Sequence, residues 1–265
     1  MKANLEEKEM DMKERKVMLA VAALLLVISS RAHAGAISAD SPADFPVEFT
    51  DCVESIGVTL VSTERARAYV PAEFILAGEG QPVTPLVVRT ARCRGIAVNG
   101  YMPKAGEIVQ VGLVIVPPDF TGDINNYTLW YYTSDAKLAT QLRDVGVAAQ
   151  HVPTIDYDFD AGDNSLFVRV PRPGSPRLAL FGTVSPSPNP AGAFLANWWQ
   201  QADAGRVKMS TQVPTINIGG ANLTLMTDPG NPLGQLIGGG STGFPIIQQF
   251  NTFTTAHMGV SVVVP

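Results

Sequence analysis

Short runs of β-branched, aliphatic and aromatic residues recur along this chain of 265 residues, with turn-forming residues between them. Such runs are typical of β-strands, because branched and aromatic side chains pack well on a pleated surface. The predicted strands are residues 56–61, 85–90, 96–98, 108–116, 127–132, 155–159, 166–170, 178–184, 207–211, 223–227 and 259–264. Turn residues stand between them at 98–100, 117–119, 161–164 and 219–220. Strands spaced this regularly, with few helices between them, predict an antiparallel barrel or sandwich.

Two segments depart from this pattern and predict short helices. Residues 135–145 follow Ser134, which can cap a helix, and end before Gly146, which can terminate one. Residues 193–204 end before Gly205 in the same way. Both segments carry apolar residues four positions apart, as on one face of a helix. These pairs are Leu138/Leu142, Phe194/Trp198 and Leu195/Trp199. The chain is therefore expected to be mainly β with minor α content.

The N-terminal segment has the features of a secretory signal. Basic residues precede the apolar run 17–28, and Ala32 and Ala34 place small residues two positions apart, as a signal peptidase requires. The run is too short to span a hydrocarbon core of about 30 Å, which needs about 20 helical residues. We expect a signal peptide over residues 1–34 and a single domain over 35–265, with an uncleaved anchor helix as the alternative. The mature protein would be secreted or periplasmic, without stable insertion in a membrane.

The charge of the chain excludes one class of partner. It has 19 basic and 24 acidic residues, and loss of the six basic and five acidic residues in 1–34 leaves 13 and 19, a net charge of −6. An acidic chain without a run of Lys or Arg is a poor match for a polyanion, so no nucleic-acid partner is expected. The local exception is Arg89, Arg92 and Arg94. We interpret them as solvated ends of neighbouring strands, with an anion site as the alternative.

The chain has two cysteines, Cys52 and Cys93. In an oxidising compartment two cysteines usually pair, and a disulfide over a loop of this length would stabilise the fold by roughly 4 kcal/mol in the chain-entropy model. Two buried free thiols are the alternative. Together with His151 and His257, the cysteines show no ligand spacing of a metal site, so no metal or other cofactor is expected.

The segment from Tyr127 to Asp160 resembles the centre of the acetoacetate decarboxylase-like superfamily. There an aromatic strand leads through a capped helix to a turn that reads Gly-Phe-Pro-Lys-Lys, and in this chain the turn is residues 146–150, GVAAQ. Residues 68–74, 221–226 and 252–264 are similar to the first and last elements of that family, so the resemblance covers residues 56–263. It implies a closed antiparallel β-barrel with a ligand pocket inside.

The resemblance places neutral residues where the family carries its catalytic charges. A lysine of the turn forms a Schiff base with the keto acid in the family, whereas Ala149 and Gln150 occupy the lysine positions here and cannot form an imine. Gln110 aligns with the glutamate that works with the lysine. The lysines of the mature chain are Lys104, Lys137 and Lys208. Only Lys208, on a predicted strand, could face a cavity, and a solvated strand lysine is the alternative.

Four residues are candidates for binding a ligand, namely Gln110, Tyr131, Arg143 and Gln150, although core packing is the alternative for Tyr131. His151 is the candidate catalytic residue, because it follows the turn and histidine titrates near neutral pH; an exposed loop histidine is the alternative. The sequence thus predicts an exported barrel that binds a small carbonyl or carboxylate molecule without decarboxylating it. The alternative is a lysine-independent lyase, isomerase or hydratase acting on a carbonyl or enol substrate. Assembly into a homo-oligomer is left open.

Overall fold

The structure, a computed structural model, describes residues 45–263, so the predicted signal peptide over residues 1–34 lies outside the described part of the chain. The strands are β1 (Phe45–Ser62), β2 (Val83–Val98), β3 (Lys104–Val114), β4 (Ile124–Thr133), β5 (Ala149–His151), β6 (Asp156–Asp160), β7 (Ser165–Val170), β8 (Leu178–Ser185), β9 (Pro190–Ala202), β10 (Gly205–Thr227), β11 (Ser241–Gly243) and β12 (Ile247–Val263). The helices are α2 (Thr63–Arg67), α3 (Ala136–Asp144) and α4 (Pro232–Ile237). Each predicted strand overlaps an observed one, so the expectation of a mainly β chain is confirmed. Within 45–263 no helix has the length and apolar character needed to cross a membrane.

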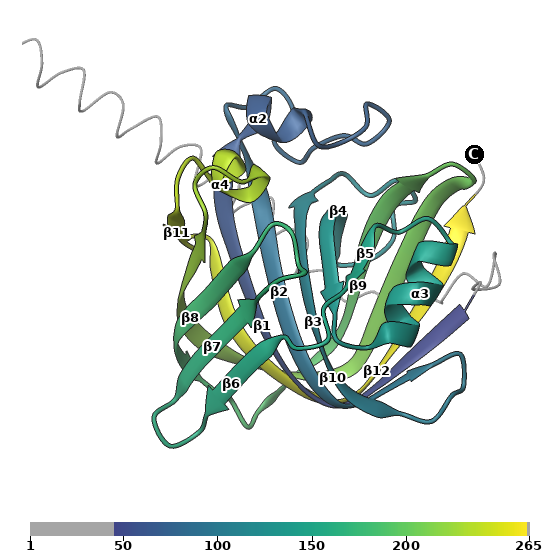
Figure 1. Ribbon diagram of the computed structural model, residues 1–265, viewed down its shortest axis with the longest axis vertical. Helices are drawn as coiled ribbons and strands as arrows, with labels where there is room; N and C mark the ends of the chain where they lie inside the picture. The colour runs from purple at the N-terminus through teal and green to yellow at the C-terminus, as the bar shows by residue number, and fades with distance from the viewer. Residues whose placement is uncertain (1–44, 264–265) are drawn as a thin grey trace, which may run out of the picture. The chain divides into compact units, whose positions relative to one another are not determined.

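Hydrogen bonds join the strands into one sheet (Figure 1). Its order is β12-β1-β2-β3-β4-β9-β10-β8-β7-β6, and β12 also pairs with β10, so the pairings of the first seven strands return to their start. Most strand pairings are antiparallel, as predicted, but β4 runs parallel to both β5 and β9. The reason for the pairing with β5 is the connection through α3, since a crossover of this kind brings the chain back beside β4 in the same direction.

The longest strand, β10, belongs to two parts of the sheet. Its first half pairs with β9 and its second half with β8, while β12 runs along both halves. The turn predicted at residues 219–220 is wrong, because Gly219 and Gly220 lie inside β10. A Cβ atom at Gly219 would collide with the carbonyl oxygen of Ser185. This glycine therefore allows two backbones to approach each other closely within a strand, and it does not form a turn.

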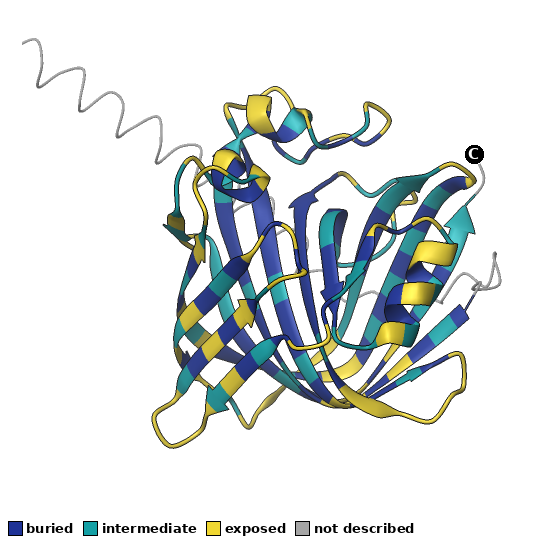
Figure 2. Ribbon diagram, viewed as in Figure 1, coloured by how far each residue is buried: buried dark blue, intermediate teal, exposed yellow. Residues whose placement is uncertain are grey.

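The central parts of strands β2 and β3 are mostly buried on both faces, as their mainly dark blue colour in Figure 2 shows. One face contributes Val88 and Val111 to a core cluster that also includes residues of β6, β7 and β8. The other face contributes Cys93 and Ile108 to a second core cluster, which includes residues of α3 and β5. Burial on both faces agrees with the apolar residues that both faces carry in the central parts of these strands. A polar side chain in the middle of either strand, such as Gln110, is consequently inside the protein.

The helix predicted over residues 135–145 is confirmed as α3, Ala136–Asp144. Its cap is Asp135, whose Oδ1 accepts a hydrogen bond of 2.7 Å from the backbone N–H of Leu138. Ser134, the expected cap, instead uses its hydroxyl to bind β3, from which it accepts one hydrogen bond and to which it donates another. The prediction of the helix was right and the prediction of its cap was off by one residue.

The second predicted helix, over residues 193–204, is wrong, because this segment forms most of β9. Trp198 and Trp199 are both buried, and each belongs to a different core cluster. Neighbouring residues point to opposite sides only in a strand, so a strand buries both indole rings where a helix could not. Gly205, expected to end a helix, instead follows the tight turn between β9 and β10, where it lies opposite Ala202.

The predicted disulfide is confirmed. Cys52 on β1 and Cys93 on β2 lie directly opposite each other in the antiparallel register, and their sulfur atoms are 2.06 Å apart. The bond therefore joins two strands that are already neighbours in the sheet, at a point where both side chains face the second core cluster.

Candidate functional site

Four residues on neighbouring strands form a row across the sheet. Arg89 on β2 lies opposite Gln110 on β3, Gln110 lies opposite Tyr131 on β4, and Tyr131 lies opposite Ala149 on β5. Residues directly opposite each other on paired strands present their side chains on the same face. The register therefore brings together Gln110, Tyr131 and Ala149, which the sequence had singled out, and adds Arg89 to them.

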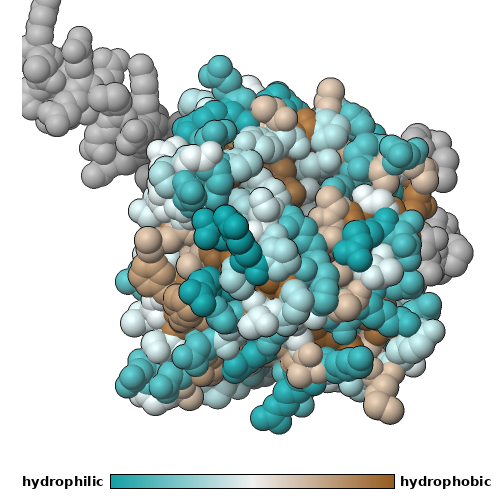
Figure 3. Space-filling model, viewed as in Figure 1, coloured by the Kyte–Doolittle hydropathy of each residue, from teal (hydrophilic) through white to brown (hydrophobic). Residues whose placement is uncertain are grey.

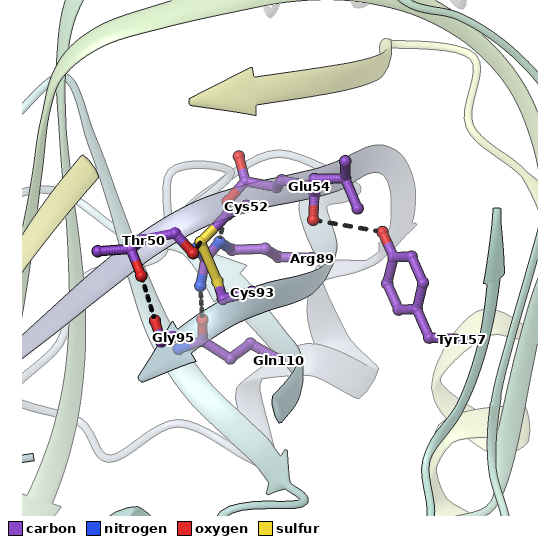
Figure 4. Close-up of a disulfide and its surroundings, with 9 residues drawn as sticks. Thr50, Cys52, Glu54, Arg89, Cys93, Gly95, Gln110 and Tyr157 are labelled. Atoms are coloured by element: carbon purple, nitrogen blue, oxygen red, sulfur yellow. Dashed lines mark hydrogen bonds and ion pairs between the residues drawn. A yellow bond between two sulfur atoms is a disulfide. The ribbon is translucent and has the colours of Figure 1, made fainter. Parts of the chain in front are cut away.

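A buried ion pair lies at one end of this row. The Nε atom of Arg89 donates to Oε2 of Glu54 at 2.5 Å, and its Nη1 atom donates to Oε1 of Gln110 at 2.7 Å. Only 11% of the Arg89 side chain and 5% of the Glu54 side chain are exposed. Figure 4 shows the pair beside the Cys52–Cys93 bond, with the amide of Gln110 reaching the guanidinium. The arrangement gives each buried charge a partner of opposite sign, which burial requires.

Asn251 completes the cluster from β12. It lies opposite Glu54 in the antiparallel register, and its Nδ2 atom donates to Oε1 of Glu54 at 3.2 Å. This contact fixes the orientation of the amide, because only the NH₂ group can face a carboxylate oxygen. The Oδ1 atom of Asn251 is buried and has no hydrogen-bond partner. Such an atom is an exception among buried polar groups and indicates a site for a donor.

The interpretation of the arginines as solvated strand ends is wrong for Arg89. All three arginines lie on one strand, β2. Arg92 is partly buried, where its Nη1 donates to the carbonyl oxygen of Tyr157 and its guanidinium lies 5.3 Å from the centre of the Tyr157 ring. Arg94 is exposed. The period of two could have found Arg89, because this residue shares a strand face with the apolar residues two positions before and after it.

Two tyrosines near the ion pair are held in their neutral form. Burial raises the pKa of Tyr131, and the positive charge of Arg89 only partly opposes this rise. Burial likewise raises the pKa of Tyr157, whose hydroxyl donates to the carbonyl oxygen of Val53 at 3.4 Å. Both phenols are therefore hydrogen-bond donors at neutral pH rather than bases.

The other candidates at the turn have structural partners. Gln150 exchanges two hydrogen bonds with the backbone of Ser175, at 2.7 and 2.9 Å, and belongs to the opposite face of β5 from Ala149. Arg143 donates from Nη1 to the carbonyl oxygen of Ala149 at 3.2 Å. His151 has its Nε2 atom 3.2 Å from the carbonyl oxygen of Ser134. None of these contacts reaches the ion pair, although Gln150 and His151 belong to β5 and Arg143 binds its backbone.

None of the three lysines in residues 45–263 contacts a residue of the row. Lys104 is exposed at the start of β3, and the ammonium of Lys137 lies over the ring of Tyr101. Lys208 forms an ion pair of 2.5 Å with Asp119 and donates to Thr121. Burial alone would raise the pKa of Asp119, but its hydrogen bonds to Lys208 and Thr121 lower it. Lys208 alternates along β10 with Val207 and Met209, which belong to the second core cluster, so it faces away from the row.

Two hollows lie where neighbouring strands stop pairing. The first, of about 240 Å³, lies where β4 leaves β9 to join β5, and its lining includes Tyr69, Thr128 and Trp130. The second, of about 420 Å³, lies between β10 and β12, which pair up to Gln212 and again from Asn217. Its lining comes from four strands and consists of Asp51, Cys52, Val53, Arg94, Thr215, Asn217, Thr252, Phe253 and Thr254. The second hollow is the one that adjoins the buried cluster, through Cys52 and Phe253.

The surface carries only small groups of exposed apolar residues on the face drawn in Figure 3. One pair, Phe167 and Phe181, lies opposite each other on β7 and β8. Groups of this size do not by themselves indicate a partner surface. Among residues 45–263, no group of three or more His, Cys, Asp or Glu side chains could hold a metal ion.

Comparison with known proteins places the fold. No protein-family model matches the sequence, and no curated protein is similar to it. A solved structure of acetoacetate decarboxylase is similar to this chain with a TM-score of 0.56 and 9% identity, over 89% of this chain and 96% of that one. Acetoacetate decarboxylase from Legionella pneumophila subsp. pneumophila str. Philadelphia 1 gives a TM-score of 0.55 and 12% identity, over 86% and 93%. The enduracididine biosynthesis enzyme MppR complexed with pyruvate gives 0.51 and 12%, also over 86% and 93%. The chain therefore has the fold of acetoacetate decarboxylase and of acetoacetate decarboxylase-like enzymes.

Proposed function

We propose that this chain is an exported acetoacetate decarboxylase-like domain that binds a small carbonyl or carboxylate molecule and does not decarboxylate it. The observation that carries the proposal is Ala149, which lies in one row with Gln110 and Arg89 where the resemblance puts a Schiff-base lysine. Decarboxylation through an imine needs a primary amine at that place, and the lysines of the described chain are elsewhere. The similarity to MppR, whose structure holds pyruvate, supports a small carbonyl ligand.

We also infer that the strands enclose the site as a closed barrel. The support is the set of pairings that leads from β12 through β1, β2, β3, β4, β9 and β10 back to β12. Tyr131 and Ala149 of the row belong to the second core cluster, to which all seven of these strands and β5 contribute apolar residues. A ligand bound there would be screened from water on most sides, as ligands in barrels commonly are.

Borohydride trapping tests the absence of an imine. Protein incubated with acetoacetate and then reduced is expected to keep its mass, and no CO₂ release above the buffer rate is expected, because neither Ala149 nor Gln150 has an amine. Intact-mass and peptide mass spectrometry give the readout. A stable adduct on Lys208, lost in Lys208→Ala together with CO₂ release, would show that the nucleophile has moved to β10 and would overturn the proposal.

The buried ion pair favours a second candidate, a lysine-independent enzyme that moves a proton on a bound carbonyl compound. Ionisable groups inside a site are a frequent sign of catalysis, and Glu54 is a carboxylate with only two hydrogen bonds to its oxygens. Two observations argue against this candidate. The carboxylate of Glu54 is paired with Arg89, and His151 contacts Ser134 rather than the Glu54–Arg89 ion pair.

Proton exchange in deuterated buffer separates the two candidates. A binding domain is expected to leave the exchange rate of the α-protons of butanone or acetoacetate at the buffer value, measured by proton NMR. General acid–base catalysis contributes about 10²- to 10⁴-fold. An acceleration of that size, abolished by Glu54→Gln or by His151→Ala in a folded protein, would establish the enzyme in place of the binding domain.

Export is tested on the protein recovered outside the cytoplasm. The mature chain is expected to begin near Gly35, because Ala32 and Ala34 mark the cleavage site. Intact mass measured with and without reductant reports both the start residue and the state of the cysteines. Recovery of a chain that keeps its first 34 residues, or in which both thiols alkylate without reduction, would contradict this expectation.

A further inference from the structure

We infer that the ligand of this site is a neutral carbonyl compound that carries a hydroxyl group, and that the hydroxyl donates to Oδ1 of Asn251. The inference rests on the proposed function, since it names the ligand class of the same site. It selects a neutral compound over a carboxylate. The reasons lie in the charge of the cluster, in its one unpartnered atom and in the hollow beside it.

The charge of the cluster is already balanced. Arg89 holds the carboxylate of Glu54 at 2.5 Å, and the amides of Gln110 and Asn251 add no charge. A ligand carboxylate would bring a second negative charge to the one guanidinium, beside a carboxylate that is 95% buried. Two carboxylates that share a buried site repel each other strongly, so one of them would have to take up a proton or stay out. A neutral ligand meets no such obstacle.

The buried side-chain atom of the cluster that lacks a hydrogen-bond partner is an acceptor. Asn251 is 1% exposed, its NH₂ group faces Glu54, and its Oδ1 atom has no partner. The Glu54 carboxylate accepts from Arg89 and Asn251, although a carboxylate offers about four acceptor positions. A ligand that donates satisfies these atoms, whereas a ligand with acceptors alone leaves Oδ1 unpaired. A hydroxyl group is the smallest neutral donor that meets this requirement.

The hollow between β10 and β12 gives the direction from which the ligand arrives. Cys52 and Phe253 line it and lie opposite each other on β1 and β12. Glu54 and Asn251 are the next pair on the same faces, two residues and about 7 Å further along the strands. Phe253 lines the hollow, is 6% exposed and lies two residues from Asn251 on β12. On this route the ligand passes the side chain of Phe253.

A matched set of ligands tests the inference on the wild-type protein. The probes are 4-hydroxy-2-butanone, 2-pentanone, which replaces the hydroxyl with a methyl group, and acetoacetate, which replaces the hydroxymethyl group with a carboxylate. Binding is measured by NMR titration at pH 7. We expect 4-hydroxy-2-butanone to bind about tenfold more tightly than either of the others, as one hydrogen bond to an otherwise unpaired buried atom allows.

Two variants assign the preference to the named residues. Asn251→Leu is expected to reduce the preference for 4-hydroxy-2-butanone over 2-pentanone to less than twofold, with Asn251→Ala as the substitute if the leucine variant loses its circular dichroism spectrum. Asn222→Leu, at an exposed position of β10, is the matched control and is expected to keep the full preference. Phe253→Leu is expected to speed association, because the ligand then passes a smaller side chain on this route.

The outcomes separate this inference from the function on which it rests. Tighter binding of acetoacetate than of 4-hydroxy-2-butanone overturns the inference and leaves a binding domain for carboxylates. Equal binding of 4-hydroxy-2-butanone and 2-pentanone, or an unchanged preference in a folded Asn251 variant, also overturns it. Failure of all three probes to bind at millimolar concentration counts against the proposed function itself.

Discussion

The variant Arg89→Met is expected to lose about 3–5 kcal/mol of its free energy of unfolding, which for a domain of this size is a large share of the total. Removing the guanidinium leaves the carboxylate of Glu54 buried, with the Nδ2 group of Asn251 as its remaining hydrogen-bond donor. The cost arises from the unpaired charge, since Met fills most of the space of Arg. Urea unfolding followed by tryptophan fluorescence gives the measurement.

Two further variants show whether the charge is responsible. Glu54→Leu combined with Arg89→Met removes both charges and is expected to recover most of the loss, because a buried pair replaced by apolar residues is often neutral for stability. Arg169→Met breaks the pair with Asp156, in which 57% and 32% of the side chains are exposed, and is expected to cost less than about 1 kcal/mol. A loss below about 1 kcal/mol for Arg89→Met would show that the pair is not buried in solution.

Removal of the disulfide is expected to have an effect of similar size. The double variant Cys52→Ala/Cys93→Ala should unfold with a free energy about 4 kcal/mol lower than the wild type, because the bond closes a loop with a sequence separation of 41 residues. Alanine is the replacement, since both cysteines are buried and a serine would add an unpaired hydroxyl. The measurement is again urea unfolding.

The wild type in the presence of dithiothreitol is the control for this prediction. Full reduction should bring its unfolding midpoint close to that of the alanine double variant. Because β1 and β2 stay paired along their length, the variant is expected to keep the wild-type circular dichroism spectrum at low urea. A midpoint unchanged by either treatment would mean that the bond does not form in the isolated protein.

The strands and one helix could be predicted from the sequence because their signals are local. Branched residues mark most strands, and the residues around α3 mark its start and end. In β9 the same kind of local reasoning failed, because Phe194, Leu195, Trp198 and Trp199 fit a helical spacing equally well. What decides in favour of a strand is burial on both faces, and that depends on β4 and β10 lying on either side of it.

The candidate site was only half predictable for a related reason. Gln110 and Tyr131 were found through the resemblance, and the register places them in one row. Glu54 and Arg89 are 35 positions apart in sequence, and Glu54 and Asn251 are 197 apart. No spacing rule joins residues at such separations. A single arginine on a strand is usually solvated, and the sequence carries no mark of the carboxylate that will face it.

The pairing of the first described strand with the last has a consequence for the order in which the chain folds. Phe45 lies opposite Val260, and β12 also fills the space beside β10. While the polypeptide is being synthesised, β1 and β10 each present an open edge until residues 247–263 have emerged. Contacts between the ends of a chain close slowly, and open edges attract other chains in the meantime. The nascent protein is therefore exposed to aggregation until its last strand is made, and a chain truncated before β12 keeps two unpaired edges.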